Sequence, residues 1–360
     1  MTERIRVDRA DAMRAPASTA PRPLQQSQSD GTVFGHVGAA AMPMGRQGIW
    51  ARPKLLLGIA GAVAAVSTWM LMDGVLGYWK YEVSGEEQPA LVGLMFIPVF
   101  CGLLAACIAS ADDLVSGSLG RGAMFAGIGA AGGAFGGLVA QIAGGIVMMV
   151  VLRIVVGSRE PESMSELLFV AMLARVPAWT LAGALAGLVC GALGRSVRRM
   201  LLGAAGGAVG GLLGGLVFDP VAFFLQPENG AGHAAVSRLL GLASVGVISG
   251  IAIAFAEDAA KSAWLVIERG RLIGKQFIIY RNPTRIGAAY SNDVFLFKDP
   301  LVQQEHAHVV RRGGQFVVEA QGGALVRVNG TPVTSKGIKG NDTIQIGETV
   351  LRFMTKAGEG

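Results

Sequence analysis

The basic side chains towards the C-terminus are the groups in this sequence best placed to bind a charged ligand. Between Ser262 and Ala357 there are 13 Lys and Arg against seven Asp and Glu, so this stretch has a net charge of +6, equal to that of the whole 360-residue chain. Such a surface could bind an acidic partner, could favour the anionic inner leaflet of a membrane, or could simply be solvated. The candidates are Arg281, Arg285, Arg311, Arg312, Arg327, Lys336 and Lys339.

Residues for catalysis or metal binding follow no recognisable pattern. Cys101, Cys107 and Cys190 all lie in apolar stretches, with no CxxC and no His at metal-ligand spacing. The stretch from Gly127 to Gly132 fits GxGxxG, but no strand precedes it and no acidic residue follows at the distance that a ribose requires. No nucleophile motif and no paired carboxylates occur on a soluble element. The sequence therefore predicts a protein that is not an enzyme, with no metal and no cofactor.

The composition places much of the chain in a membrane. Its residues are 52% hydrophobic and only 16% charged, with 53 glycines, which is unlike an ordinary soluble globule. Each uncharged window is long enough to cross about 30 Å of hydrocarbon at about 1.5 Å per residue. The windows predict six spans within residues 53–258: residues 55–72, 88–111, 122–152, 176–194, 200–218 and 239–256.

The N-terminal segment differs in composition from the apolar region. Residues 1–52 are rich in Pro, Ala, Ser, Gln and Gly and have few large apolar side chains, so we expect a disordered cytoplasmic tail. The first apolar window begins only at Leu55, too far along the chain for a cleaved signal peptide. It is therefore predicted to be a retained anchor.

Loop charges set the expected orientation, because Lys and Arg near helix ends stay on the cytoplasmic side. Lys54 precedes the first window, and Arg121 and Arg195 mark the second and fourth loops, whereas Glu86 and Glu87 make the first loop acidic. We predict a multi-pass protein of the inner (plasma) membrane with both termini in the cytoplasm.

Two places leave the spans open. The window over residues 122–152 is long enough either to tilt strongly or to break. The run Arg175-Val-Pro177 suggests that residues 167–174 lie along the outer interface. The span count is therefore open around residues 122–157 and 167–194.

An internal repeat runs through the apolar region at an offset of 74. Residues 113–139 match residues 187–213, and a partial third copy covers residues 253–258. Because the offset contains two spans, the copies are predicted to be parallel, with their charged ends in the cytoplasm.

Glycines recur at every fourth position inside the two copies and form a smooth strip on one helix face, where another backbone could approach closely. We interpret them as helix-packing positions of a glycine zipper. The alternative is a pore or transport path, but such paths usually need buried ionisable groups, and away from their ends the windows hold few polar residues beyond Gln141 and Arg175. The packing positions are Gly129, Gly133, Gly137, Gly203, Gly207 and Gly211.

After residue 258 the pattern changes to short alternating runs rich in Val, Ile and Phe, separated by turn signals such as Gly313-Gly314 and Asn329-Gly330. The lengths and spacing predict an all-β sandwich over residues 259–360. The fold class is thus multi-domain: an α-helical transmembrane bundle with parallel Gly-rich repeats, followed by the sandwich. The expected strands are residues 263–268, 276–280, 293–297, 307–312, 315–320, 325–328, 343–346 and 350–355.

Five linked motifs in this region resemble, in order and spacing, those of a forkhead-associated (FHA) domain. The motifs are Arg285-Ile-Gly-Ala288, Ser291-Asn-Asp-Val-Phe-Leu296, Glu305-His-Ala-His-Val309, Val328-Asn-Gly330 and Gly340-Asn-Asp-Thr-Ile-Gln-Ile-Gly347. The whole chain is also similar to bacterial membrane proteins in which glycine-zipper spans precede an FHA domain. The resemblance implies a β-sandwich that binds phosphothreonine peptides through loops at one end, without catalysis. Its structural positions fall on Gly287, Asn292, Asp293, His306, Gly330, Asp342 and Gly347.

The phosphate-contacting positions of the family are mostly replaced in this chain. Ala288 stands where an Arg normally follows the Ile-Gly turn. The Ser and Arg of the family's Ser-Arg-x-His motif fall on Gln303 and Gln304, while the His is kept as His306. The family's Asn falls near Ala324, or at Asn329 in a shifted register. His306 is interpreted as a residue that supports the loop.

These replacements predict weak or non-standard phosphothreonine recognition. A Gln amide offers a dipole without a charge, and each lost charge-assisted hydrogen bond is worth about 1.5–3 kcal/mol. Any phosphopeptide or acidic-partner site that remains is expected at Arg285, Gln303, Gln304 and Asn329.

The sequence as a whole predicts a membrane-anchored FHA protein that acts as a cytosolic interaction or signalling scaffold. Its expected partners are a cytosolic protein or phosphoprotein, membrane lipid and, as an open option, further copies of the chain. Nucleic acid is not expected, because no stripe of alternating aromatic and basic residues is present. The alternative function is a transporter or channel subunit regulated by its FHA domain.

Overall fold

The computed structural model describes residues 52–77, 89–151, 153–154, 157, 163–224 and 231–356. The expected disordered tail lies outside these residues except for Arg52, as do the acidic residues of the first loop. The described helices and strands all belong to one compact unit.

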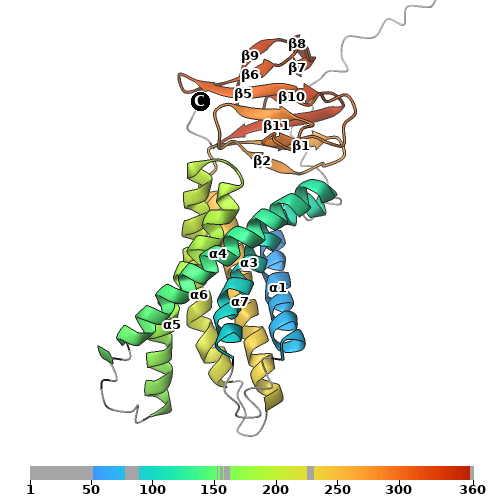
Figure 1. The fold of residues 1–360 in the computed structure, drawn as a ribbon. Helices are drawn as coiled ribbons and strands as arrows, with labels where there is room; N and C mark the ends of the chain where they lie inside the picture. Colours follow the sequence, from blue (N-terminus) through green and yellow to red (C-terminus); the bar gives the residue numbers. More distant parts are fainter. Residues whose placement is uncertain are drawn as a thin grey trace, which may run out of the picture. The chain divides into compact units, whose positions relative to one another are not determined.

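Within the described residues, six helices are long and apolar enough to cross a membrane. They form the helical part of the chain in Figure 1. Their bounds are α1 Pro53–Trp69, continued by the π-helical segment η4 Met70–Val75, α3 Ala90–Val115, α4 Leu119–Val151, α5 Met164–Ala192, α6 Val197–Phe224 and α7 Ala231–Ala259.

The two places that the sequence leaves open both lie in unbroken helices. α4 runs through all of residues 119–151 without a break. α5 contains Pro177 in its interior, and the hydroxyl of Ser163 caps its first turn by accepting a hydrogen bond from the Glu166 amide at 3.1 Å. Residues 167–174 are therefore continuous with the rest of α5 and precede the part of that helix, from Arg175, that is apolar enough to cross a membrane. A single proline removes only one backbone donor, so a well-capped apolar helix can continue through it.

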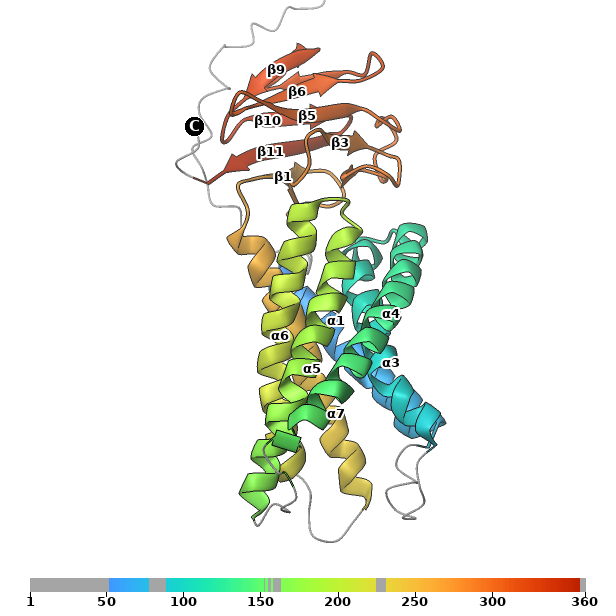
Figure 2. The same ribbon diagram turned by 60° about the vertical axis from the view of Figure 1, so that its left-hand side comes forward.

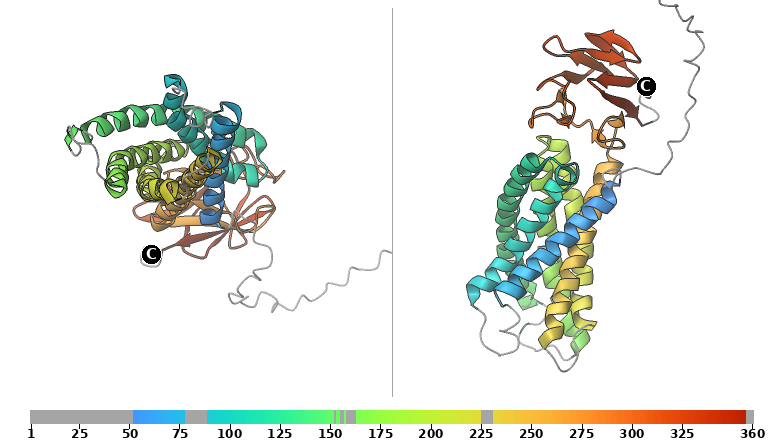
Figure 3. Two further views of the ribbon diagram at one scale, coloured as in Figure 1. Left: turned by 90° about the horizontal axis from the view of Figure 1, so that it is seen from below. Right: turned by 90° about the vertical axis from the view of Figure 1, so that its right-hand side faces the viewer.

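The six helices pack in a closed ring, each contacting the next in the chain, with α1 also against α7. Figure 2 shows α5 and α6 side by side, and Figure 3 shows α1 in blue beside α7 in gold. The ammonium of Lys54 lies 3.3 Å from the carboxylate of Asp258. The start of α1 and the end of α7 therefore lie at the same end of the ring.

Several helix pairs approach closely at glycines. A Cβ added to Gly133 of α4 would lie 2.4 Å from the carbonyl oxygen of Cys101 of α3. A Cβ on Gly211 of α6 would lie 2.2 Å from the Trp179 carbonyl of α5. The other face of α6 meets α7, since a Cβ on Gly210 would lie 2.2 Å from the Ser249 Cα. These distances are far below van der Waals contact, so a side chain at these positions would separate the backbones.

The matched repeat residues do not pair in the same register. Gly129 of the first copy lies against Ala105. At the offset of 74, the equivalent pair in the second copy would be Gly203 and Trp179. Gly203 instead lies against Gly187. The α3–α4 turn includes Gly117 at φ 83°, while the α5–α6 turn includes Arg195 at φ 49°. The two hairpins thus use similar sequences with differently placed turns.

A buried ion pair joins η4 to α7. The Nε of Arg238 lies 3.2 Å from Asp73 Oδ1, and its Nη2 also donates to that oxygen. Asp73 is only 2% exposed and Arg238 is 9% exposed. Nearby, the indole N–H of Trp69 donates to the Ala235 carbonyl at 2.8 Å. In the sequence, Asp73 directly follows the apolar window of residues 55–72, and Arg238 directly precedes the window of residues 239–256.

The C-terminal part is a sandwich of two sheets, drawn in orange to red in Figure 1. One sheet has the strand order β2-β1-β11-β10-β7-β8 and the other β4-β3-β5-β6-β9. The strands are β1 Ala263–Arg269, β2 Gln276–Ile278, β3 Thr284–Gly287, β4 Val294–Phe295, β5 Ala307–Arg312, β6 Gln315–Ala320, β7 Val326–Val328, β8 Thr331–Val333, β9 Ser335–Ile338, β10 Thr343–Ile346 and β11 Thr349–Thr355.

The two sheets enclose one apolar core. Burial alternates along β1 and β11, as expected when only one face of each strand meets the opposite sheet. Facing residues such as Leu265, Ile286, Val318 and Phe353 are fully buried. Only Ala260, Lys261 and Ser262 separate α7 from β1.

Candidate functional site

Three loops meet at one end of the sandwich: β3–β4, β4–β5 and β6–β7. The Ala288 amide donates to the Gln303 carbonyl at 2.9 Å and the Ala289 amide to the Gln304 carbonyl at 3.1 Å, which fastens the first loop to the second. The Gln321 amide donates to the His306 carbonyl at 2.9 Å and joins the third. Backbone bonds therefore fix the end at which the sequence predicts binding.

His306 braces two of these loops from within. It is 3% exposed. Its Nδ1 accepts from the Gln303 amide at 3.1 Å, and its Nε2 lies 3.1 Å from the Leu325 carbonyl oxygen. These partners require the proton on Nε2, because a carbonyl can only accept. Both ring nitrogens are thus used inside the protein, the geometry of a loop-supporting residue.

The β3–β4 loop is held by its Gly, Asn and Asp positions. A Cβ on Gly287 would lie 2.3 Å from the Gln304 carbonyl oxygen, so only glycine fits there. The buried side chain of Asn292 donates to the same carbonyl. Asp293 accepts from the Arg285 amide at 2.9 Å and pairs with Arg281 at 3.3 Å.

The four predicted binding residues divide into two groups. The side chains of Gln303 and Gln304 are exposed at the loop end, and Arg285 pairs at 3.7 Å with Glu305 of the same loop. Asn329 instead lies in the β7–β8 turn at φ 51°. It donates to Asp342 at 2.8 Å and accepts from the Thr343 amide at 2.8 Å, while Gly330 follows it at φ 80°. The structure therefore brings Arg285, Gln303 and Gln304 together and engages Asn329 in a different turn.

Asp299, which no sequence motif singled out, connects the β4–β5 loop to the β10–β11 turn. Its carboxylate accepts from the amides of Glu348 at 2.8 Å and Thr349 at 2.9 Å, and from the Thr349 hydroxyl at 2.8 Å. It also accepts from the Leu301 amide at 3.1 Å. Gly347, at φ 61°, leaves room for that carboxylate, since a Cβ there would lie 2.7 Å from Asp299 Oδ1.

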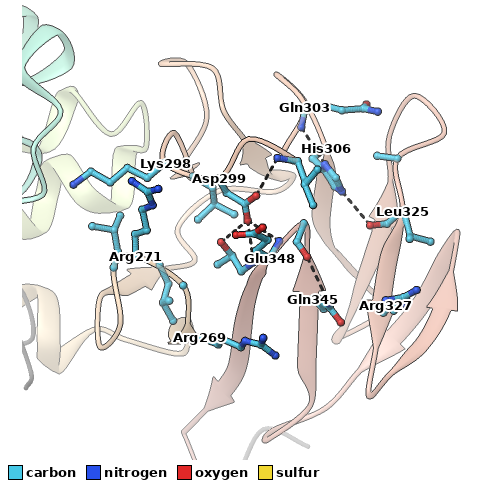
Figure 4. A pocket seen from close by; sticks show the side chains of 18 of the residues that line it. Arg269, Arg271, Lys298, Asp299, Gln303, His306, Leu325, Arg327, Gln345 and Glu348 are labelled. Carbon is cyan, nitrogen blue, oxygen red and sulfur yellow. Dashed lines mark hydrogen bonds between the residues drawn. The ribbon is translucent and has the colours of Figure 1, made fainter.

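A cavity of about 870 Å³ opens at this end of the sandwich. It is walled by the β1–β2, β4–β5 and β6–β7 loops and the β10–β11 turn, and Figure 4 shows it from close by. Gln303, His306 and Ala324 line one part, so the cavity adjoins the positions that the FHA resemblance marks. Its charged lining residues are Arg269, Arg271, Lys298, Asp299, Arg327 and Glu348.

Most of the cations at this cavity were not predicted from the sequence. Of the predicted basic surface only Arg327 lines it, while Arg312 pairs with Glu319 at 2.8 Å on the opposite sheet. The missed residues are Arg269, the last residue of β1, and Arg271, which flank Gly270. The pattern Arg-Gly-Arg at the end of a strand was the feature of the sequence from which these cations could have been predicted.

Neither a metal site nor an acid–base group marks this region. Among the described residues, no group of three His, Cys, Asp or Glu side chains could hold a metal ion. Elsewhere in the sandwich, burial raises the pKa of the Tyr280 phenol above its ordinary value, and Glu257 adds to the shift. The phenol therefore stays neutral under physiological conditions.

Comparison with known proteins agrees with the motifs. The sequence profile of the FHA domain matches residues 284–347. The glycogen accumulation regulator GarA of Mycolicibacterium smegmatis is 36% identical over 95 residues, which are 26% of this chain. This chain spans 60% of the length of GarA.

Other relatives cover the same region. The oxoglutarate dehydrogenase inhibitor of Corynebacterium jeikeium is 34% identical over 99 residues, 27% of this chain and 68% of the inhibitor. Among solved structures, Mycobacterium tuberculosis EmbR in complex with a low affinity phosphopeptide is 17% identical and covers 86% of this chain and 72% of its own, with a TM-score of 0.25. The identity and coverage shared with the inhibitor show that this chain belongs to the FHA domain family, its FHA domain being the C-terminal sandwich.

Proposed function

We propose that this chain is a membrane-anchored FHA protein that holds an interaction module in the cytosol, where the module binds an acidic or phosphorylated segment of a partner protein. Its recognition of phosphothreonine is weak or non-standard. It acts as a scaffold rather than as an enzyme, in keeping with the names of its relatives, which describe a regulator and an inhibitor.

One observation carries this proposal. The loops at the end of the sandwich are held in a fixed arrangement, but the positions where the FHA family contacts phosphate lack charged side chains. His306, Gly287 and Asn292 fix the loops by internal hydrogen bonds and close packing. The exposed side chains of Gln303 and Gln304 can donate to a phosphate only from an uncharged amide group. A dianionic phosphate needs charge-assisted bonds to offset its desolvation, so these two positions favour weak binding.

The membrane anchor is supported by the six apolar helices and by the ion pairs at one end of the ring. Lys54 pairs with Asp258, and Arg199 of α6 pairs with Glu257 at 3.1 Å. Arg121 at the start of α4 pairs with Asp113 at the end of α3. Basic residues thus collect at the end that leads into β1, which favours a cytoplasmic location for both termini in an inner membrane.

We further propose that the spaced glycines of α4 and α6 act as a zipper rather than as a transport path. The close approaches at Gly133 and Gly211 support tight pairing. The buried charges Asp73 and Arg238 neutralise one another, which is typical of a structural pair. Apolar side chains exposed on α4, including Phe135 and Ile142, would face lipid or a further copy of the chain.

Peptide binding to the full chain in lipid nanodiscs tests the proposed function. Fluorescence anisotropy would compare a phosphothreonine peptide with its Glu and unmodified Thr versions. We expect both acidic peptides to bind more tightly than the Thr peptide, with less than about a tenfold gain of phosphothreonine over Glu, and affinity that falls steeply with salt. Equal binding of all three peptides would contradict the function. Micromolar binding confined to the phosphothreonine peptide would contradict the weak-recognition part.

A further inference from the structure

We propose that the cavity beside the β1–β2 loop is where the acidic segment binds, with its negative charge held by Arg269 and Arg271 rather than at the family's phosphate positions. This inference rests on the proposed function, because it names the part of the domain that would perform it.

The cavity lining holds more cations than anions. Among the residues that the structure describes, Arg269, Arg271 and Arg327 form no ion pair, although the adjacent Glu268 is paired with Arg352. Figure 4 draws Arg271 and Lys298 at one end of the cavity and Arg327 at the other. The Lys298 ammonium donates to the Ser116 carbonyl, a neutral acceptor that adds no negative charge to the cavity. An anionic ligand would offset this unbalanced charge.

The acidic groups at the cavity do not cancel its positive charge. The carboxylate of Asp299 is occupied by three backbone amides and the Thr349 hydroxyl. The carboxylate of Glu348 is the other acid of the lining, and its side chain is exposed. Four cations against two acids leave the lining net positive, and Glu348 should weaken the binding of an acidic ligand.

The β1–β2 loop, which carries Arg271 and directly follows Arg269 at the end of β1, is held in place before any ligand binds. Ile267 exchanges backbone bonds across it, donating to Lys275 at 3.0 Å and accepting from Gly274 at 2.8 Å. Leu272, only 4% exposed, anchors the loop in the core. A fixed loop loses little conformational entropy on binding, so its charges contribute more to affinity.

The shape and apolar lining favour a peptide over a lipid headgroup. About 870 Å³ lies within the range of sites that enclose ligands larger than a single anion. Leu301 and Leu325 line the cavity with exposed fractions of 62% and 57%, so apolar side chains could pack beside the charge. The cavity also extends to Gln303 and Ala324 of the recognition loops. An extended segment with acidic residues between leucines fits this surface.

Charge variants of the full chain in phosphatidylcholine nanodiscs test the site. The probe is a fluorescein-labelled peptide with two adjacent glutamates flanked by leucines, together with its phosphothreonine version. We expect Arg269→Glu and Arg271→Glu each to weaken binding by about tenfold or more, and Arg271→Lys to retain most of it. The matched control is Lys336→Glu, an equal charge change at an exposed position of β9 that does not line the cavity, and it should change affinity less than about twofold.

A variant that raises affinity distinguishes a direct effect on binding from a loss of binding caused by misfolding. Glu348→Gln removes the opposing carboxylate and keeps the backbone bond to Asp299, so we expect affinity to rise about two- to fivefold. Binding that survives both Arg→Glu changes, or that is lost instead with Arg285→Glu, would overturn the inference while leaving the proposed function intact. A wild type that does not distinguish acidic from neutral peptides would mean that the proposed function itself has failed. If Arg271→Glu abolished binding to phosphatidylserine vesicles but left the affinity for the peptide unchanged, the cavity would be a lipid site. That result would overturn the inference.

Discussion

Gly183 of α5 and Gly207 of α6 touch backbone to backbone: a Cβ on Gly207 would lie 2.0 Å from the Gly183 carbonyl oxygen, and one on Gly183 would lie 2.2 Å from that of Gly207. The relationship is mutual, so neither residue can be enlarged without separating the two helices. Gly207 was predicted as a packing position from the sequence, whereas its partner Gly183 was not.

The first prediction concerns this contact and its counterpart between α3 and α4. Gly207→Leu and Gly133→Leu should each destabilise the helical region by about 1–3 kcal/mol or more, because the added side chain overlaps the backbone of the neighbouring helix. Thermal unfolding of the full chain in detergent measures the effect. Gly127→Leu is the matched control on α4, since a Cβ there meets no atom within 4 Å. Equal tolerance at all three positions would contradict a packing role.

The second prediction concerns Asp73 and Arg238. Arg238→Met leaves a buried carboxylate without its partner and should cost about 3–5 kcal/mol. The double change Asp73→Leu with Arg238→Met removes both charges and should regain most of the lost stability. The midpoint of thermal unfolding in detergent distinguishes the two. A double variant as unstable as the single one would show that the charges do more than neutralise each other.

The third prediction addresses the β3–β4 loop. Gly287→Ala should displace the Gln304 carbonyl, because the new Cβ would lie 2.3 Å from its oxygen, and we expect a loss of about 1–3 kcal/mol. Hydrogen exchange read by mass spectrometry should rise in residues 288–306. Gly337→Ala is the control, since a Cβ there meets nothing within 4 Å. Unchanged exchange in the Gly287 variant would mean that the loop end relaxes without strain.

The fourth prediction is the membrane topology. With the native cysteines replaced by alanine, single cysteines at Leu119, Val197 and Ala260 should react only with reagents that reach the cytoplasm. Cysteines at Ser84, Ser163 and Gly230 should react from outside the intact cell. Labelling of position 260 from outside would reverse the orientation and place the FHA domain away from cytosolic partners.

Sequence pattern predicted the regular parts of the sandwich well. The bounds expected for β5, β6 and β10 agree with the structure, because their apolar residues alternate cleanly between turn signals. β3, β8 and β9 were not expected. β3 buries three of its four residues, and β8 and β9 are largely exposed, so none of them carries a clear alternation.

The candidate site was harder to predict because it depends on contacts between distant loops. Asn329 and Asp342 bond to each other across two turns, which no local pattern reveals. Arg269 and Arg271 share a cavity with residues 296–306 and 323–327 only because the sheets bring these loops to one end. Likewise, Arg238 directly precedes an apolar window in the sequence, and nothing local to it indicates that it is buried against Asp73.

The three residues between α7 and β1 also limit where the FHA domain can search for partners. A fully extended linker of that length reaches only about 10 Å, so with the helices in a bilayer and this end in the cytosol, as we propose, the domain would stay in the layer of cytosol next to the lipid. A soluble partner must come to the membrane to be captured, while the cytoplasmic tail of a neighbouring membrane protein is already present there at high local concentration. In the proposed orientation this short linker would make even a weak peptide site effective for partners that share the same membrane.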